Sequence, residues 1–426
     1  MKLQRRDRRM KKYLERDLSA PVYRFDQVPD PRARKSKHTL GALLLTALVG
    51  LMAGCRKLRD VEALTEELGP TGEQYLEGRV PDTTLHDLLE HPKLEVEPLR
   101  QQLYWQVKMQ ARQKRLKPVG LPCGVLAMDG KKLHCLDHDA QGDAQRVTGS
   151  EGKADYYLLR VQRVVLTSAA GKPALDQMVI PPDTNEMGIF AEFFLRQVQT
   201  YGDLFEIVTT DAGMTSLANA DLVDKEHKAY VMALKENQPE LYAEAQRLLL
   251  PKTEEAPEAQ TPWERHGSRS VRRLLYRSQD IEGYHGWSHL RQVWLVRQES
   301  RDKEGKVTVE DRYFLTSLRI GRLQAQQILR VVRNHWGIEN DCFWSLDAQF
   351  GEDHHPWVTT GHALLALGLL RLIAYNVLQW ARKCHLRHQL RSGRLADPPS
   401  WQSLFRWVQQ ALRMPLDPPQ VPQPAD

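Results

Sequence analysis

The sequence predicts an α/β fold, in which a mixed sheet carries helices on its faces and follows an all-helical region. Apolar residues up to about residue 120 recur at helical spacing. Beyond residue 124, short apolar strand-like runs alternate with amphipathic helical patterns. Two of these runs end on an acid, at Asp129 and Asp211. Alternating strands and helices are typical of a sheet with helices packed on its faces.

The N-terminal region reads as a helical, basic domain over residues 1–120. Helices are predicted at residues 39–55, 60–67, 85–89 and 95–113. Basic residues dominate segments 1–17 and 112–117, which suits a DNA-binding domain, although a solvated surface is the commoner role of such runs. Prolines at residues 118 and 122 break the helical pattern and mark a boundary.

Residues 121–250 read as the first part of an α/β core. Strands are predicted at 125–129, 156–168, 174–180, 205–211 and 229–234, and helices at 185–199, 216–225 and 239–249. This order of elements is that of the ribonuclease H-like fold. In that fold the first and fourth of these strands lie side by side, so Asp129 and Asp211 are expected at one edge of the sheet.

The remaining sequence reads as a β-rich insertion followed by helices. The insertion covers residues 251–320, with strands at 271–276, 290–296 and 312–318. Helices at 324–344 and 362–383 are expected to complete the core over residues 321–390. Residues 391–426 are predicted to hold a C-terminal helix at 401–412 and a disordered, proline-rich tail.

Composition favours a cytoplasmic protein with a polyanionic partner. The 426 residues carry a formal net charge of +6, and no two of the five cysteines form a Cys-x-x-Cys pair. The apolar runs at 40–54 and 363–380 are interpreted as buried core helices, because the first is short for a membrane span and the second contains Arg371 and Asn376.

Three acids stand out as a candidate site: Asp129, Asp211 and Glu339. Glu339 lies among Trp336, Ile338 and Phe343, where a carboxylate is costly to bury unless it is paired or bound to a metal. If the three carboxylates meet, they repel one another unless cations lie between them. Magnesium prefers such oxygen ligands, and two ions about 4 Å apart can hold the attacking and leaving oxygens of a phosphodiester.

The chain resembles the DDE transposases of bacterial insertion sequences, in the ISAs-type, H-repeat-associated branch. The resemblance covers roughly residues 23–383 and rests on the order and spacing of several short motifs. These are Asp30-Pro31-Arg32, Asp129-Gly130-Lys131, Thr184-Asn185-Glu186, Thr210-Asp211-Ala212, Ala233 to Gln238, His335 to Asn340, Leu346-Asp347 and Glu352-Asp353.

The resemblance implies a ribonuclease H-like core of the retroviral integrase type. It also implies that Asp129, Asp211 and Glu339 are both the catalytic triad and the ligands of two Mg²⁺ or Mn²⁺ ions. The implied function is cleavage of insertion-sequence ends and joining of the 3′-hydroxyl to target DNA. The expected partners are double-stranded DNA, as element ends and as target, and a second copy of the chain on paired ends.

Further residues near these motifs are candidates for DNA contacts: Lys131, Lys235, Asn237, Gln238, His335, Trp336 and Asn340. Ordinary surface lysines are an equal alternative for Lys131 and Lys235. Asn237 and Gln238 are slightly favoured as a cap for the next helix. For Glu186, a role at the helix start competes with a supporting role at the site.

Three departures from related transposases concern these contacts. His335 stands where relatives outside the branch have an arginine, and Asp347 stands where they have a lysine. Residues 133–135, Leu-His-Cys, replace an arginine and small residues in a segment expected to be a loop. The phosphate contact of the lysine therefore has no evident equivalent.

Two other functions compete with transposition. One is a transposase-derived protein that binds DNA without strand transfer, and the other is a metal-dependent nuclease. The intact triad argues against the first, because DNA binding alone does not require three acids. Inverted repeats beside the reading frame would favour transposition over both.

Overall fold

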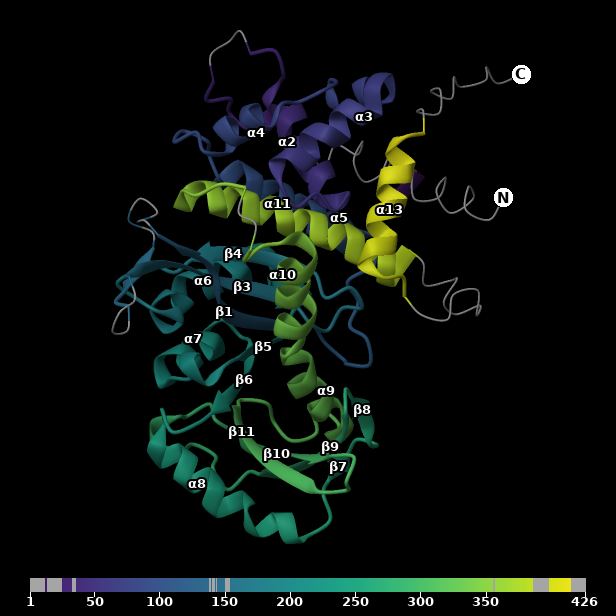
Figure 1. The fold of residues 1–426 in the computed structure, drawn as a ribbon. Coiled ribbons are helices and arrows are strands. Elements are labelled where there is room, and N and C mark those ends of the chain that lie inside the picture. The colour runs from purple at the N-terminus through teal and green to yellow at the C-terminus, as the bar shows by residue number, and fades with distance from the viewer. Residues whose placement is uncertain are drawn as a thin grey trace, which may run out of the picture. The chain divides into compact units, whose positions relative to one another are not determined.

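A computed structural model describes residues 12–13, 25–32, 36–137, 139, 142, 144–149, 154–354, 357–385 and 398–414. The chain forms two compact units, drawn in Figure 1. One comprises residues 1–109 and 345–426, and the other comprises residues 110–344.

The described secondary structure of the first unit is helical. In chain order it comprises η1 (Phe25–Gln27), α2 (Leu40–Met52), α3 (Leu58–Leu76), α4 (Asp82–Leu89), most of α5 (Glu97–Arg112), nearly all of α10 (Trp344–Phe350), α11 (Gly361–Trp380), the π-helical η7 (Ala381–His385) and α13 (Trp401–Leu412). Helix α2 begins after Thr39, whose hydroxyl accepts a hydrogen bond from the Ala42 N–H and so satisfies one free donor of the first turn. The packing centre is α11, which contacts α2 and α4.

Helix α11 owes its apolar composition to this central place. Among the described residues, the segment Gly361–Lys383 is long and apolar enough to cross a membrane, but 89% of its most apolar window is buried inside the protein. Asn376 Nδ2 donates to Gln106 Oε1 at 3.2 Å, and Gln106 Nε2 donates to the Ile373 carbonyl at 3.1 Å. These bonds satisfy polar groups that would be costly to bury alone, as in a core helix.

The second unit is built on one 11-stranded sheet. Its strands are β1 (Val125–Leu136), β2 (Gln145–Val147), β3 (Tyr156–Leu166), β4 (Ala174–Val179), β5 (Ile207–Thr210), β6 (Ala229–Leu234), β7 (Ala259–Gln260), β8 (Glu264–His266), β9 (Arg269–Ser278), β10 (Gln292–Arg301) and β11 (Val307–Thr316). The order is β2-β3-β1-β5-β6-β11-β10-β9-β7, with β4 paired to β3 and β8 to β9. Pairs β1–β5 and β5–β6 are parallel, and the other pairs are antiparallel.

Helices and short helical turns accompany this sheet. They are α6 (Glu186–Tyr201), η2 (Gly202–Leu204), η3 (Ala212–Met214), α7 (Leu217–Lys225), α8 (Pro239–Leu249), η4 (Pro251–Glu254), η5 (Tyr284–Gly286), α9 (Ala325–His335) and the π-helical η6 (Ile338–Phe343). The core places Val125, Ile207 and Val231 of β1, β5 and β6 together with Ile328 and Val332 of α9. Helix α9 thus presents its apolar side to the sheet.

The predicted neighbourhood of the first and fourth strands is confirmed, since β1 and β5 pair in parallel. Three local expectations were wrong. Strand β1 continues past Asp129 to Leu136, because its residues 126–136 pair with β3, so Asp129 lies within a strand and residues 133–135 are not a loop. The predicted helix over 324–344 is interrupted, because α9 ends at His335 and a π-helical segment follows.

The insertion strands are not a separate sheet. Strand β11 pairs with β6 from Tyr313–Leu234 to Thr316–Val231, so β7 to β11 extend the sheet that contains β1 and β5. The insertion strands are therefore hydrogen-bonded, through β11, to β6, the strand that ends just before Lys235.

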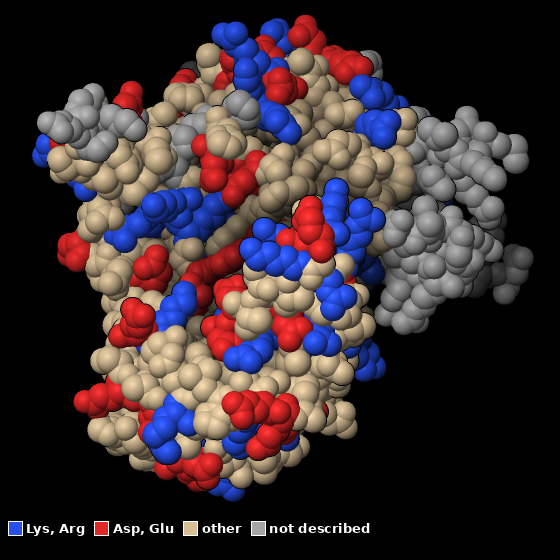
Figure 2. Space-filling model, turned by 60° about the horizontal axis from the view of Figure 1, so that its bottom comes forward, with Lys and Arg blue, Asp and Glu red and all other residues tan. Residues whose placement is uncertain are grey.

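Acidic and basic side chains are mixed on one face of the described surface. Figure 2 shows Lys and Arg interspersed with Asp and Glu on the face drawn. Of the predicted basic segment 1–17, residues 12 and 13 are described and the rest lies outside the described residues, as does the predicted tail from residue 415.

The start of β1 depends on a close backbone approach at Gly124. A Cβ there would clash with the Leu204 carbonyl oxygen, while the Gly124 carbonyl accepts from the N–H of Glu206 at 3.0 Å. We expect Gly124→Ala to lower the free energy of unfolding by about 1–3 kcal/mol, as overpacking does. The matched control is Gly202→Ala, whose Cβ would meet its nearest atoms at 3.9 Å. Chemical denaturation measures both, and equal stability of the two variants would contradict the prediction.

Candidate active site

The parallel pairing of β1 with β5 brings two of the predicted acids to one edge of the sheet. Val125 to Met128 pair with Ile207 to Thr210 in register, and each chain then continues into an aspartate, Asp129 or Asp211. The carboxyl ends of adjacent parallel strands are where open α/β sheets place their binding groups. The register therefore sets the two carboxylates side by side.

Asp129 is the buried member of the group, with 8% of its surface exposed. Burial, together with the nearby carboxylates of Asp211 and Glu339, raises the pKa of Asp129 to about 8. The Gly130 backbone N–H opposes the shift as a hydrogen-bond donor. Asp211 and Glu339 therefore both lie within electrostatic reach of Asp129.

Glu186 is a fourth carboxylate close to Asp129. Asn185 caps α6 by accepting hydrogen bonds from the N–H groups of Met187 and Gly188, both at 3.1 Å, and Glu186 is the first residue of the helix. A Cβ at residue 130 would clash with the Glu186 carboxylate, which also contributes to the raised pKa of Asp129. Asn185 therefore makes the cap, and the Glu186 carboxylate lies against the strand that carries Asp129.

His335 connects Asp211 to strand β5. Its Nδ1 lies 2.9 Å from Thr209 Oγ1, and its Nε2 lies 3.8 Å from Asp211 Oδ1. Interaction with His335 holds the pKa of Asp211 below its usual range. His335 is 5% exposed, and it also lines the cavity beside Asp211.

Glu339 lies in the π-helical turn that follows α9, and its side chain is exposed. Such turns insert a residue into the helical path and occur often at functional sites. Lys172 Nζ contacts Asp341 Oδ2 of the same turn at 2.5 Å. A Cβ at Gly337 would lie 2.5 Å from Lys172 Nζ, so glycine lets the lysine approach the turn closely. Lys172 has a positive φ of 41°, which is uncommon for a non-glycine residue.

A cavity of about 780 Å³ opens beside Asp211 and Glu339. Among the residues that the structure describes, its lining includes five carboxylates and two cations: Asp211, Glu236, Glu310, Asp311, Glu339, Lys235 and Arg312. Because carboxylates outnumber these cations, such a surface would repel a phosphate unless metal ions were also bound. Several hard oxygen donors around one space are a fitting ligand set for Mg²⁺ or Mn²⁺.

The candidates for DNA contacts are placed differently from one another. Lys235 and Trp336 line the acidic cavity, whereas Lys131 Nζ lies 5.6 Å from the centre of the Phe343 ring. Asn340 Nδ2 donates to the Trp336 carbonyl at 3.0 Å. Their roles in DNA binding stay predictions.

Asn237 and Gln238 brace the loop that follows Asp211. Asn237 Nδ2 donates to the Ala212 carbonyl at 2.7 Å, and Gln238 Nε2 donates to the Thr215 carbonyl at 3.1 Å. Gln238 occupies the cap position of α8 but makes no capping bond with its side chain. The slight preference for a capping role was therefore wrong, because both amides serve the loop instead.

Sequence reasoning missed three residues of this region: Arg312, Thr209 and Lys172. The guanidinium carbon of Arg312 lies 4.1 Å from the centre of the Trp336 ring. Arg312 comes from β11, and nothing in the local sequence indicates that this strand reaches the edge that carries Lys235. The turn at residues 170–173 is visible in the sequence, but the contact of Lys172 with residues 337 and 341 is not.

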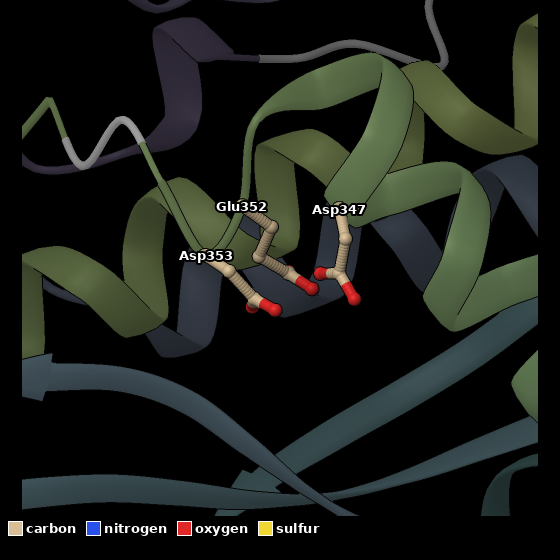
Figure 3. Close-up of side chains that lie close together, drawn as sticks. All are labelled: Asp347, Glu352 and Asp353. Atoms are coloured by element: carbon tan, nitrogen blue, oxygen red, sulfur yellow. The ribbon is translucent and has the colours of Figure 1, made fainter.

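A second acidic group lies in the helical unit. Figure 3 shows Asp347, Glu352 and Asp353, whose carboxylate oxygens lie within 4.8 Å of one another. Glu352 is fully buried, and Gly351, with a φ of 64°, makes the turn at the end of α10. The spacing suits a cation, but these are not the acids predicted as the triad.

Comparison with known families settles the broad class of the protein. A family model described as "Transposase DDE domain" matches residues 123–377, more than half of the chain. The chain belongs to the DDE transposase family. The match contains both strands of the central parallel pair, α9 and the π-helical turn.

Two relatives from Escherichia coli strain K12 match nearly the whole length of this DDE transposase family member. "Putative protein YbfL" is 23% identical over 403 residues, which is 90% of this chain and 95% of the relative. "H repeat-associated putative transposase YhhI" is 23% identical over 386 residues, which is 86% of this chain and 92% of the relative. Membership of the family implies DNA binding and the use of divalent metal.

The raised pKa of Asp129 gives the transposase a characteristic pH dependence without metal. Its folded-state pKa of about 8 lies above its ordinary value of 3.8, so its contribution to stability is lost as pH rises toward 8. We expect Asp129→Asn to become more stable than the wild type as pH rises from 5 to 9, by a few kcal/mol at most, since one pKa unit is about 1.4 kcal/mol.

Denaturation in EDTA at several pH values measures this difference. Asp203→Asn, at an exposed position of the same unit, is the control and should show no such trend. A constant difference between Asp129→Asn and the wild type from pH 5 to 9 would contradict the prediction.

Proposed function

We propose that this protein is a transposase that cleaves the ends of an insertion sequence and joins the freed 3′-hydroxyl to target DNA. The observation that carries the proposal is the convergence of Asp129, Asp211 and Glu339, through which two carboxylates raise the pKa of the third. Family membership supports it independently.

We propose a ribonuclease H-like arrangement for the catalytic core. Support comes from the strand order β4-β3-β1-β5-β6, in which β1, β5 and β6 are parallel and β3 is antiparallel to β1. In such a core the three acids come from two neighbouring strands and a late helix. We also propose that the boundaries between the domains lie near residues 120, 250, 320 and 390.

Asp129, Asp211 and Glu339 would hold two divalent ions, Mg²⁺ or Mn²⁺. Bound there, the ions would lower the pKa of the attacking water or hydroxyl and stabilise charge on the leaving oxygen. Thr209 holds the His335 imidazole in place through Nδ1, and the other nitrogen of the ring, Nε2, orients the Asp211 carboxylate. The loop after Asp211 is held by Asn237 and Gln238, which restricts movement of the carboxylate during the reaction.

The triad can be tested by isosteric substitutions. Asp129→Asn, Asp211→Asn and Glu339→Gln should each lower metal-dependent nicking of DNA from the flanks of the reading frame by at least about a thousandfold, comparable to the loss of a main catalytic group. Each variant keeps the shape of the side chain and removes the charge that holds the ions. Gel analysis of the cut strands measures the rate.

The matched control is Glu192→Gln, which removes an exposed carboxylate of α6 paired with Arg196 at 3.1 Å. It should nick DNA at the wild-type rate. A second readout is thermal: metal at a hundredfold excess over its Kd should stabilise the wild type by about 2.7 kcal/mol and the triad variants much less. Near wild-type nicking by any triad variant would show that its residue is misassigned.

We also propose that two protomers act on paired ends. Strand transfer joins both ends of an element to one target, and each end requires its own set of acids. Light scattering should therefore find two protomers on DNA that carries both ends. A complex that keeps one protomer per paired-end DNA would contradict transposition and favour a nuclease.

A further inference from the structure

Helix α9 carries a polar stripe with two arginines on the side opposite its buried residues. Gln326, Arg330 and Arg333 follow one another at spacings of four and three, so they lie on one helix face, and all three are exposed. The other face buries residues such as Ile328 and Val332 in the core. The stripe is therefore a separate surface from the side that carries His335.

This stripe forms one wall of a second cavity, of about 500 Å³, which we name the α9 groove. Among the described residues, its charged lining consists of Lys172, Arg330, Arg333 and Glu264, and its polar lining includes Gln326 and Asn334. Cations thus outnumber carboxylates here, whereas the cavity beside Asp211 shows the reverse. An anion can enter the α9 groove without a metal ion.

Arg330 is held in position by a turn that only a small residue permits. Its Nη1 donates to the Val119 carbonyl at 3.2 Å. Gly120 has a φ of 67°, and a Cβ there would clash with the Arg330 guanidinium. Since the guanidinium carries five N–H donors and one goes to Val119, the group can offer others to an anion in a fixed orientation.

Glu264, the carboxylate that lines the groove, is shared between Arg333 of the lining and Arg273, which lies outside the lining. Arg333 Nη1 contacts Glu264 Oε1 at 2.7 Å, and Arg273 Nη1 lies 3.8 Å from Glu264 Oε2. One carboxylate therefore faces two guanidinium groups. Arg273 is buried, with 8% of its surface exposed, and its Nε and Nη1 have no hydrogen-bond partner in the described part of the chain. The single carboxylate of the groove lining is therefore already engaged by cations.

We propose that the α9 groove binds the sugar–phosphate backbone of a DNA duplex. The inference rests on the proposed function, which supplies DNA as the anion, but it concerns a different surface from the acidic cavity. Arginine binds phosphate oxygens through paired N–H donors and needs no metal to do so. Contacts of this kind position a duplex without reading its sequence.

The test is duplex binding by the full chain in EDTA, measured by fluorescence anisotropy over a range of salt concentrations. Arg330→Gln should weaken binding by about tenfold and reduce the slope of log K against log salt by about 0.9, the value for one lost phosphate contact. Arg330→Lys should retain the slope because it keeps the charge. The matched control is Arg247→Gln on α8, an exposed arginine paired with Glu244 at 2.6 Å, which should behave as wild type.

A charge-gain variant covers the case in which Arg330→Gln fails to fold. Gln326 is an exposed residue of the groove whose Nε2 donates to the Gln260 carbonyl at 3.1 Å. Gln326→Lys should increase the salt slope by about 0.9, and Gln326→Glu should weaken binding. Equal binding and slope for Arg330→Gln and Arg247→Gln, or an unchanged slope for Gln326→Lys, would overturn the proposal.

Two probes distinguish the source of the DNA. One is a 30-base-pair duplex of arbitrary sequence, and the other is an equal duplex copied from the flank of the reading frame. Equal weakening on both assigns the groove to any duplex, target included, and weakening confined to the flank duplex assigns it to element ends. Nicking tests the triad, and metal-free binding tests the groove. If Asp211→Asn nicks DNA at the wild-type rate while Arg330→Gln weakens binding, the triad is misassigned and the groove stands. If Asp211→Asn loses nicking while Arg330→Gln binds as wild type, the groove is misassigned and the triad stands.

Discussion

The parallel pairing of β1 with β5 is the constraint on which the rest of the site depends. Four residues on each strand, Val125 to Met128 and Ile207 to Thr210, fix the register of the two aspartates that follow. A shift of one residue would turn one carboxylate to the opposite face of the sheet. The buried residues of these strands pack against α9, so the same core that stabilises the pair also places the helix that leads to Glu339.

Bringing these carboxylates together is electrostatically unfavourable, and it affects the pKa of Asp129 and that of Asp211 differently. Asp129 is buried among other carboxylates, and its pKa rises accordingly, whereas Asp211 has His335 beside it and its pKa falls. Two carboxylates at one edge thus differ in their readiness to ionise before any ligand binds. The family as a whole uses divalent metal, and a site of this kind gains stability when positive charge is supplied.

The sequence was most informative where function and local pattern coincide. Asp211 follows a short apolar run, and its place directly after a strand could be predicted from residues 205–211 alone. Asp129 was harder, because the strand continues through Lys131 to Leu136 by pairing with β3, a contact that lies tens of residues away along the chain. A helical period also extends through Trp336 without any sign of the π-helical turn, since one inserted residue barely alters the apolar spacing.

Long-range partners account for the rest of what the sequence could not supply. No local pattern indicates that His335, a candidate for DNA contact, lies beside Thr209 and Asp211. Strands β9 to β11 were recognisable as strands, but their union with β6 depends on pairings such as Tyr313 with Leu234. Patterns along a chain identify elements, whereas pairing between elements decides which side chains meet.

Strands β6, β11, β10 and β9 are neighbours in one sheet. Positions in the insertion therefore differ in how closely they are tied to β6. Near Tyr313, backbone hydrogen bonds tie β11 to β6. Inserting or deleting a residue there would displace Arg312 from the Trp336 ring. At the far end, β10 and β11 join through an exposed turn at residues 302–306, closed by a bond between the Asp302 N–H and the Lys306 carbonyl at 3.1 Å. That tip is a place where evolution can lengthen the hairpin, and where a fluorescent or affinity module can be grafted, without disturbing the register of the strands behind it.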